Sequence, residues 1–367
     1  MDSSVDAVII GMGYVGLPLA REASAKGLSV IGLDVNAEVV DGLNHGRSHI
    51  DDLSDSNVEE MLGQGFFATI DARQLRRART IVICVPTPLS SDGAPDLGPV
   101  RVAVRSVAEQ LQTGTMVILE STTYPGTTDE EIRPILESGG MTAGKDFYLA
   151  FSPERIDPGN PNFGPKNTPK VVGGHTSACA DVAEAFYSRF VDRVVRTKGT
   201  REAEMAKLLE NTYRHINIAL VNEMARFCHD LNIDLWEVSG GASTKPFGFQ
   251  SFRHRSGVGG RRIPIDSDYL SHYVRAKLGY PFRCVELAEE INSMPAYLGR
   301  RVQDLPNRDS NAVRGASVVA GHDLASESDL YGAVANADAC VLLQNDRKDD
   351  ADELALGAGT LEALTCH

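Results

Sequence analysis

Three glycines near the N-terminus are the first residues whose spacing indicates chemistry. Gly11, Gly13 and Gly16 form the pattern G-x-G-x-x-G between an apolar run and a helix-like segment, with Tyr14 and Val15 completing the loop. Bare backbone in such a loop lets a pyrophosphate lie against the helix N-terminus. The pattern therefore predicts dinucleotide binding.

An acidic residue stands where such a site needs one. Asp34 ends the next apolar run, 18 residues beyond Gly16, and Val35 rather than an arginine follows it. A carboxylate at this place can accept hydrogen bonds from both ribose hydroxyls and repels a 2′-phosphate, so NAD is predicted rather than NADP. A glycine-rich turn beside a solvated aspartate is the alternative. The complete order of strand, turn, helix and strand favours the cofactor site.

Four other polar residues could act on a substrate. Lys207 and Asn211 are four apart in a helix-like stretch, so they share a face, from which they can stabilise an alkoxide or hold a water. Thr122 and Glu154 each follow an apolar run, at the strand ends where open α/β sheets bind ligands. Without further context, the first pair fits a solvated helix face, and the second fits a helix cap and a surface ion pair.

The elements that must position these residues alternate between strand and helix up to about residue 196. This alternation predicts an α/β fold with a doubly wound parallel sheet. Strands are predicted at residues 7–10, 28–34, 81–85, 115–120 and 147–151, and helices at 14–26, 98–112 and from Pro125.

The pattern changes near Thr200. Some thirty residues of helical period would make a rod of roughly 45 Å, a length that usually bridges domains or subunits. Residues 245–264 are predicted as a loop, 266–305 as helices, and 316–321 and 338–345 as strands. We therefore predict an NAD-binding domain at 1–198, a helical central domain at 199–305 that forms a homodimer through its long helix, and a small C-terminal α/β domain at 306–367.

Composition restricts the partners and the setting. Thirty-six Lys and Arg against fifty Asp and Glu give a net charge of −14, which argues against a sequence-independent nucleic-acid binder. No run of about 18 apolar residues predicts a membrane span, and the acidic start is unlike a signal peptide. The cysteines show no metal-ligand or redox spacing, which favours a reducing cytoplasm and no metal; they are Cys84, Cys179, Cys228, Cys284, Cys340 and Cys366.

Longer motifs resemble those of the UDP-glucose/UDP-N-acetylmannosamine/GDP-mannose 6-dehydrogenase family over almost the whole chain. Its members oxidise a sugar C6 alcohol to a carboxylate with two NAD and a covalent thiohemiacetal on cysteine. The SPER-x-x-PGN form is more similar to the UDP-N-acetylhexosamine branch than to the UDP-glucose branch. The matching segments are GMGYVGLPLA (11–20), ICVPTPLSSDGAPDL (83–97), ESTTYPGTT (120–128), SPERIDPGN (152–160), AEMAKLLENTYRHINIALVNEMA (203–225), ASTKPFGF (242–249) and GGRRIPID (259–266).

The resemblance implies roles for single residues. Lys207 and Asn211 would stabilise the developing alkoxide, and Thr122 would contact a water or hydroxyl. Glu154 would assist proton transfer or hydrolysis. Thr87, in VPTP, would lie beside the nicotinamide half of the cofactor, and Asp266 would orient the site.

One departure from the family changes the expected outcome. Where relatives carry Gly-Gly-His-Cys before Ile-Pro, this chain has Gly-Gly-Arg-Arg, so Arg262 stands at the position of the nucleophilic cysteine. A guanidinium stays protonated and cannot attack an aldehyde. The first hydride transfer needs no thiol, so we expect a two-electron oxidation that stops before the acid.

A second departure concerns substrate binding. The expected C-terminal nucleotide-binding segment is reduced, while Arg253, Arg255 and Arg262 concentrate positive charge in one loop. They could clamp the phosphate or carboxylate of a nucleotide sugar, sugar phosphate or sugar acid by bidentate hydrogen bonds. A mobile, solvated loop is the alternative.

The sequence thus predicts an NAD-dependent oxidoreductase acting on a CH–OH group of a nucleotide sugar or related sugar anion. Two alternatives stay open. One is an epimerase that uses NAD transiently and releases no NADH. The other is a pseudoenzyme that binds NAD or a catalytically intact paralogue.

Overall fold

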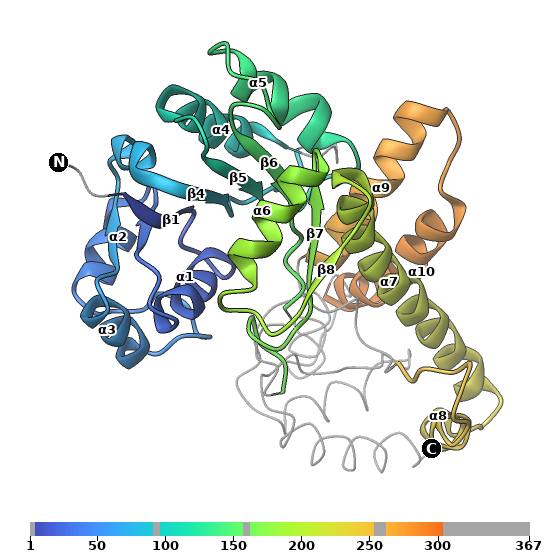
Figure 1. The fold of residues 1–367 in the computed structure, drawn as a ribbon. Coiled ribbons are helices and arrows are strands. Elements are labelled where there is room, and N and C mark those ends of the chain that lie inside the picture. The colour runs from blue at the N-terminus through green and yellow to red at the C-terminus, as the bar shows by residue number, and fades with distance from the viewer. Residues whose placement is uncertain (1–3, 91–95, 157–161, 253–261, 304–367) are drawn as a thin grey trace. The chain divides into compact units, whose positions relative to one another are not determined.

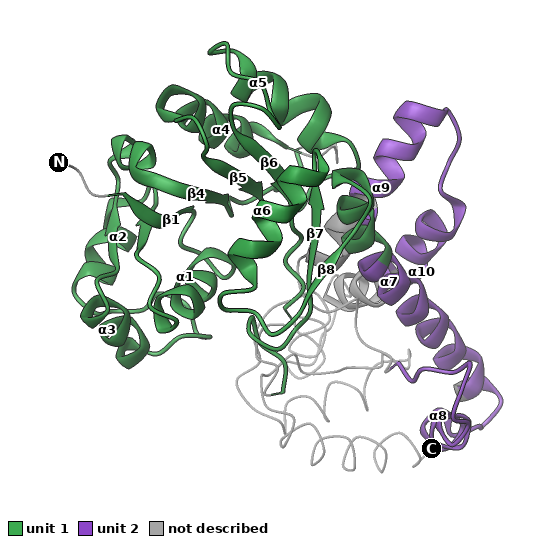
Figure 2. Cartoon of the chain, in the orientation of Figure 1, with its two compact units in different colours: residues 1–209 green, residues 210–367 purple. Residues whose placement is uncertain are grey.

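The computed structural model describes residues 4–90, 96–156, 162–252 and 262–303. The chain divides into two compact units, Met1–Leu209 and Glu210–His367 (Figure 2). The division falls within the long helix. The domain limits expected at 198 and 305 stay predictions, and the strands expected at 316–321 and 338–345 lie outside the described residues.

The first unit is an α/β sandwich around one sheet (Figure 1). The sheet has the order β3-β2-β1-β4-β5-β6-β7-β8 in the described residues. The strands are β1 (Val5–Ile10), β2 (Val30–Leu33), β3 (Phe67–Thr69), β4 (Ala78–Ile83), β5 (Met116–Leu119), β6 (Tyr148–Phe151), β7 (Lys170–Gly174) and β8 (Val194–Arg196).

Strand direction confirms the predicted doubly wound sheet with one exception. The strands from β3 to β6 pair in parallel, and β7 runs antiparallel to β6. Strand β7, and therefore this reversal, was not predicted from the sequence, because the run is short and ends in Gly173 and Gly174. The strand order reverses between β1 and β4, the place at which such sheets bind nucleotides.

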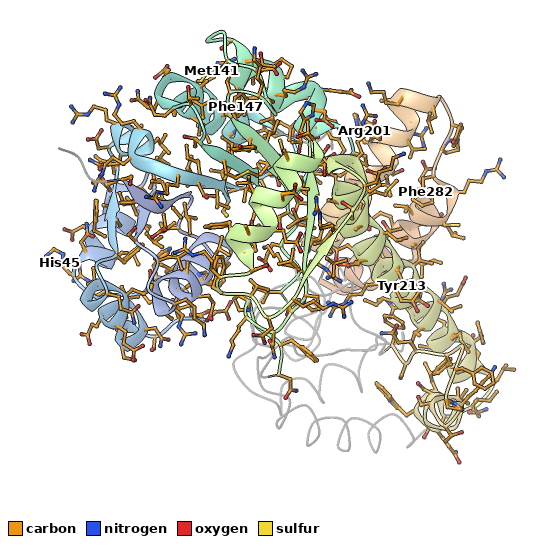
Figure 3. The ribbon with its side chains drawn as sticks, viewed as in Figure 1. His45, Met141, Phe147, Arg201, Tyr213 and Phe282 are labelled. Carbon is orange, nitrogen blue, oxygen red and sulfur yellow. The ribbon has the colours of Figure 1, made fainter. Side chains whose placement is uncertain are left out.

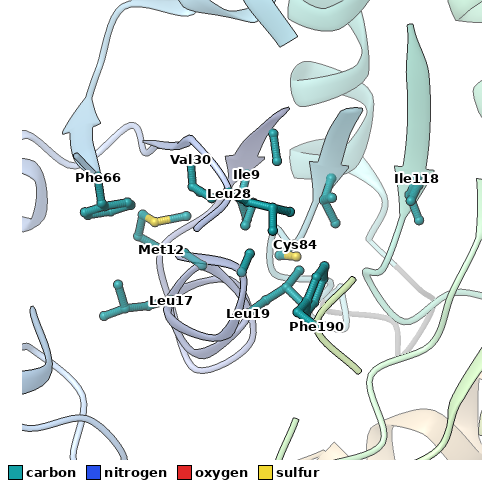
Figure 4. Packing of buried hydrophobic residues seen from close by; sticks show 14 of the residues in the cluster. Ile9, Met12, Leu17, Leu19, Leu28, Val30, Phe66, Cys84, Ile118 and Phe190 are labelled. Atoms are coloured by element: carbon teal, nitrogen blue, oxygen red, sulfur yellow. The ribbon is translucent and has the colours of Figure 1, made fainter. Parts of the chain in front are cut away.

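Helices cover both faces of the sheet because alternate residues of each strand are buried on opposite sides. Along β1, Ala7 and Ile9 join the core beneath α1, whereas Val8 and Ile10 join the core beneath α4 (Figure 4 shows the first of these). The helices of the unit are α1 (Gly16–Ala25), α2 (Ala37–Asn44), α3 (Asp55–Gly63), α4 (Gly98–Gln110), α5 (Arg133–Glu137) and α6 (Ser177–Tyr187), with the short η1 (Ala72–Arg77) and η2 (Thr127–Ile132).

The predicted long helix is confirmed as α7 (Thr200–Asp230), which continues from the first unit into the second. Figure 3 labels Arg201 and Tyr213 along it. The second unit adds α8 (Leu235–Ser243), α9 (Arg262–Leu278) and α10 (Arg283–Gln303). No helix of the described ranges has the length and apolarity to cross a membrane.

Polar contacts join the helices of the second unit. The Asn292 amide donates to the backbone oxygen of His215 at 3.1 Å and accepts from the Asn222 amide at 2.9 Å. Tyr269 of α9 and Val285 of α10 are buried as well. The loop predicted for 245–264 is too long, because α9 already begins at Arg262. Pro264 can lie in a first helical turn, where its missing N–H leaves no hydrogen bond unmade.

Candidate functional site

The glycine loop is built for close backbone contacts at the switch point of the sheet. Gly11 has φ +91°, and a Cβ there would lie 2.7 Å from the backbone oxygen of Cys84 at the end of β4. A Cβ on Gly16 would lie 1.9 Å from the oxygen of Gly11. Both positions therefore require glycine, as the sequence predicts.

The remaining residues of the loop fit NAD. A Cβ on Gly13 would meet no atom within 4 Å, so the space beside it is open. Val15 is the N-cap of α1, and its apolar side chain cannot occupy the N–H groups that a pyrophosphate would use. Asp34 accepts hydrogen bonds from Met12 N at 2.8 Å and Asn36 N at 2.9 Å, one on each carboxylate oxygen. Each oxygen keeps a lone pair for a ribose hydroxyl.

Three predicted residues lie just after neighbouring parallel strands. Thr87 follows β4 and Thr122 follows β5, and both are half-buried. Glu154 follows β6 and is buried. Parallel strands present their carboxyl ends at one edge, so the three belong to the edge that carries the glycine loop.

Glu154 belongs to a buried charged cluster that also contains Glu120, Lys170 and Tyr187. Lys170 Nζ lies 3.0 Å from Glu120 Oε1 and 3.3 Å from Glu154 Oε2. The Tyr187 hydroxyl donates a hydrogen bond to Glu120. The second oxygen of Glu154 accepts the backbone N–H groups of the two residues that follow it, at 2.7 and 2.6 Å.

The pKa values of the two carboxyls in this cluster shift in opposite directions. Burial raises the pKa of Glu120, and the negative charge of Glu154 adds to this against the pull of Lys170. Burial also disfavours the anion of Glu154, but Lys170, the two backbone N–H groups and Lys207 together lower its pKa. Glu154 is therefore the carboxyl whose anion the cluster favours. The attraction between Glu154 and Lys207 shows that these two predicted site residues lie near one another.

Lys207 is placed by a second buried carboxylate on its own helix. Glu204 accepts hydrogen bonds from Gly126 N at 2.6 Å, Thr128 N at 2.8 Å and Thr128 Oγ1 at 2.7 Å. These contacts fix the start of α7 on the loop that follows Thr122. Burial raises the pKa of Glu204 to about 7 despite them. Lys207 follows about one turn later on the same helix.

The other predicted residues belong to the second unit or lie outside the description. Asn211 is half-buried on α7, four residues after Lys207, so the two share a helix face. Arg262 begins α9 and Asp266 lies within that helix. Arg253 and Arg255 lie outside the described residues.

Three of the described cysteines are buried and one is exposed. Cys84 is packed in the core near Leu19 and Phe190 (Figure 4), and burial together with the charge of Glu120 raises its pKa well above the usual range. Cys179 and Cys228 are buried as well, and Cys284 is exposed on α10. Cys340 and Cys366 lie outside the described residues.

Fold and site define a class: a nucleotide-binding α/β unit with the glycine loop and acidic residue of an NAD site, followed by a helical unit. Comparison with known families makes this specific. The NAD binding domain of the UDP-glucose/GDP-mannose dehydrogenase family matches residues 5–191, and the central domain of that family matches residues 201–294. The chain belongs to this family, and its first unit carries the family's NAD-binding domain.

Individual members of this family are similar to most of the chain. The UDP-N-acetyl-D-mannosamine dehydrogenase of Pyrococcus horikoshii is 36% identical over 292 residues, 79% of this chain and 68% of that protein. The UDP-N-acetyl-D-glucosamine 6-dehydrogenase of Salmonella typhi is 36% identical over 320 residues, 86% of this chain and 73% of that protein. The solved structure of the P. horikoshii UDP-D-ManNAc dehydrogenase superposes with a TM-score of 0.74, covering 80% of this chain and 70% of that one.

Sequence reasoning missed four residues that shape the site: Glu120, Lys170, Tyr187 and Glu204. Two of them carried a usable signal. Glu120 and Lys170 are charged residues that directly adjoin apolar runs, and a charge beside a buried strand usually has a buried partner. Tyr187 and Glu204 lie on amphipathic helices, where no local pattern distinguishes them from surface residues.

Proposed function

We propose that the chain catalyses the NAD-dependent two-electron oxidation of a CH–OH group in a UDP-N-acetylhexosamine or a closely related nucleotide sugar. The named relatives and the SPER form of the motif at 152–155 support this substrate class. One observation carries the outcome. Arg262 stands where the family motif has its cysteine, while Lys207 and Glu154 are retained.

The predicted polar residues at the strand ends and on α7 can perform the oxidation. NAD, when bound, accepts the hydride. Lys207 and Asn211 stabilise the negative charge that develops on the substrate oxygen, and Glu154, held as an anion, accepts the hydroxyl proton directly or through a water contacted by Thr122. Because the pKa of Glu154 is lowered, it returns this proton to solvent at neutral pH.

The reaction then stops, because acid formation by the family route needs a thiolate that adds to the aldehyde. Arg262 cannot supply one. Of the described cysteines, Cys84 is held as a thiol in the core, and Cys179 and Cys228 are buried. The product we propose is therefore an aldehyde, or a ketone if a ring carbon is oxidised.

The arginine-rich segment and the long helix complete the proposal. Arg253, Arg255 and Arg262 would bind the anionic part of the substrate, and Asp266 would orient the site. Exposed apolar side chains on the second half of α7, Leu220 and Phe227 among them, support a homodimer formed through this helix.

A substrate panel with aldehyde trapping tests the function. The chain is incubated with NAD and each of UDP-N-acetylmannosamine, UDP-N-acetylglucosamine, UDP-glucose and GDP-mannose, with hydroxylamine present, and products are weighed by mass spectrometry. We expect NADH and an oxime from a UDP-N-acetylhexosamine. A carboxylate product would contradict the proposal. An epimerised sugar without NADH would favour the epimerase, and cofactor binding without any turnover would favour the pseudoenzyme.

A further inference from the structure

Lys170 lies at the centre of the buried cluster beside the proposed site. It begins β7 and is 6% exposed, and both of its carboxylate partners are buried. Its ammonium lies 3.0 Å from Glu120, 3.3 Å from Glu154 and 5.3 Å from the centre of the Tyr187 ring. No residue of this set except Glu154 has a role in the proposed reaction.

The charges of the cluster explain why a lysine is needed. Two carboxylates near one another in a buried place cannot both ionise unless a cation lies between them. Burial alone would lower the pKa of Lys170, but Glu120 and Glu154 raise it above its ordinary value, so the ammonium is permanent. One cation thus faces two possible anions.

The hydrogen bonds around Glu120 and Glu154 decide which of the two is stabilised as the anion. Glu154 has additional donors, since the backbone N–H groups of Arg155 and Ile156 occupy its Oε1 while Lys170 faces its Oε2. Glu120 is deeper and receives the Tyr187 hydroxyl. Both oxygens of Glu154 are therefore held by donors that favour the anion and fix the plane of the carboxylate.

We propose that Lys170 is a positioning residue for the oxidation: it keeps Glu154 ionised and correctly oriented so that Glu154 can accept the substrate proton. This inference rests on the function proposed above. Lys170 acts through Glu154 and is not itself assigned any contact with the substrate. Glu120 is the second carboxyl partner of the ammonium, at 3.0 Å.

The test compares Lys170→Met with the charge-preserving Lys170→Arg in the full chain. Lys166→Met, which removes an exposed lysine from the same segment, is the matched control. Two readouts are used. The first is the titration of the Glu154 carboxyl by ¹³C NMR, assigned by its loss in Glu154→Gln, and the second is the pH dependence of kcat/KM for NADH formation.

We expect the Lys170→Met change to raise the titration midpoint of Glu154 by about 1–3 pH units, because an adjacent cation lowers a carboxyl pKa by that amount. The acidic limb of the rate profile should move upward by the same interval. Lys170→Arg should keep the Glu154 titration midpoint and the acidic limb of the rate profile close to those of wild type. Lys166→Met should leave both unchanged.

Several results would overturn the inference. An unchanged Glu154 titration in folded Lys170→Met would do so, and so would a shifted titration with an unmoved rate profile, which would leave Lys170 a purely structural residue. If Lys170→Met does not fold, the Glu120→Gln/Lys170→Met double variant, which leaves a single carboxylate, replaces it with the same expected direction. If the wild-type chain forms no NADH with any sugar of the panel, the proposed function fails. The role of Lys170 in positioning Glu154 for catalysis then fails with it. In that case the NMR titration decides only whether Lys170 sets the charge of Glu154.

Discussion

The two units of the chain bury different kinds of polar group. In the first unit, buried Glu120, Glu154, Lys170 and Glu204 carry or can carry charge. In the described part of the second unit, the buried polar side chains are neutral amides, hydroxyls and an imidazole, and burial lowers the pKa of that imidazole, His215.

This difference shows where charge can be stabilised. Removing a hydride and a proton from an alcohol creates charge that fixed ions must balance, and the first unit holds such ions close to the cofactor loop. We propose, from the resemblance of GGRRIPID (259–266) to the family motif, that Arg262 of the second unit stands at the position of the family's cysteine. In our account the first oxidation depends on the charged residues of the first unit together with Asn211 of α7, and this chain has lost only the step that a thiol would supply.

The largest effect is expected for Lys207→Met. Without its ammonium the developing alkoxide lacks its main cation, so NADH formation should fall roughly 10²–10³-fold, the loss typical of one removed electrostatic donor. Steady-state rates with the best sugar of the panel measure this. Lys198→Met, at an exposed position of the same unit, should change the rate little. Equal losses in both variants would contradict the role of Lys207.

A stability prediction concerns Glu204, whose pKa is raised from 4.5 to about 7. The folded chain binds this proton more tightly than the unfolded chain, so the stabilisation is complete below about pH 4.5 and is lost as the pH rises through about 7. Glu204→Gln should remove this dependence. The free energy of unfolding of the variant relative to wild type should therefore rise by about 3 kcal/mol between pH 4.5 and pH 8.

Urea unfolding followed by circular dichroism at the two pH values measures this difference. Glu202→Gln, at an exposed position two residues earlier, is the control and should leave the pH dependence of wild type intact. A Glu204→Gln profile parallel to that of wild type would show that folding does not raise the pKa of Glu204.

A smaller effect is expected for Asp34→Ser at the cofactor loop. The loss of hydrogen bonds to the ribose hydroxyls should raise the Kd for NAD about tenfold, while the loss of negative charge should improve the binding of NADP relative to NAD. Isothermal titration of both cofactors checks this, with Asp52→Ser on an exposed loop as the control. An unchanged preference between the cofactors would contradict the assignment of Asp34.

The smallest expected effect is that of Arg262→Cys, which tests the difference between the two units most directly. Arg262→Cys returns a thiol to the position where the family has one, so the ratio of NADH formed to substrate consumed should rise from one toward two. Arg193→Cys adds a thiol at an exposed position of the first unit and should leave the ratio unchanged. If neither variant forms any carboxylate, then the missing thiol is not what stops the reaction.

Local patterns in the sequence predicted the parts of the site that depend on neighbours in the chain. Gly11 and Gly16 were predictable because a glycine turn between strand and helix has few alternatives, and α7 because its helical period is long. Tyr187 and Glu204 were not, because partners of theirs lie 67 and 76 residues away and meet only when the chain folds. The short strands β3, β7 and β8 were missed, since β3 and β8 have three residues each and β7 is a short run that ends in two glycines, too little for a clear pattern.

The central claim is that hydride removal survives while acid formation does not. The most direct test is the exhaustive reaction of a limiting UDP-N-acetylhexosamine with excess NAD, counting NADH formed per sugar consumed. Our account predicts one NADH per sugar and a trappable carbonyl product. Two NADH per sugar, with a uronic acid as product, would contradict it.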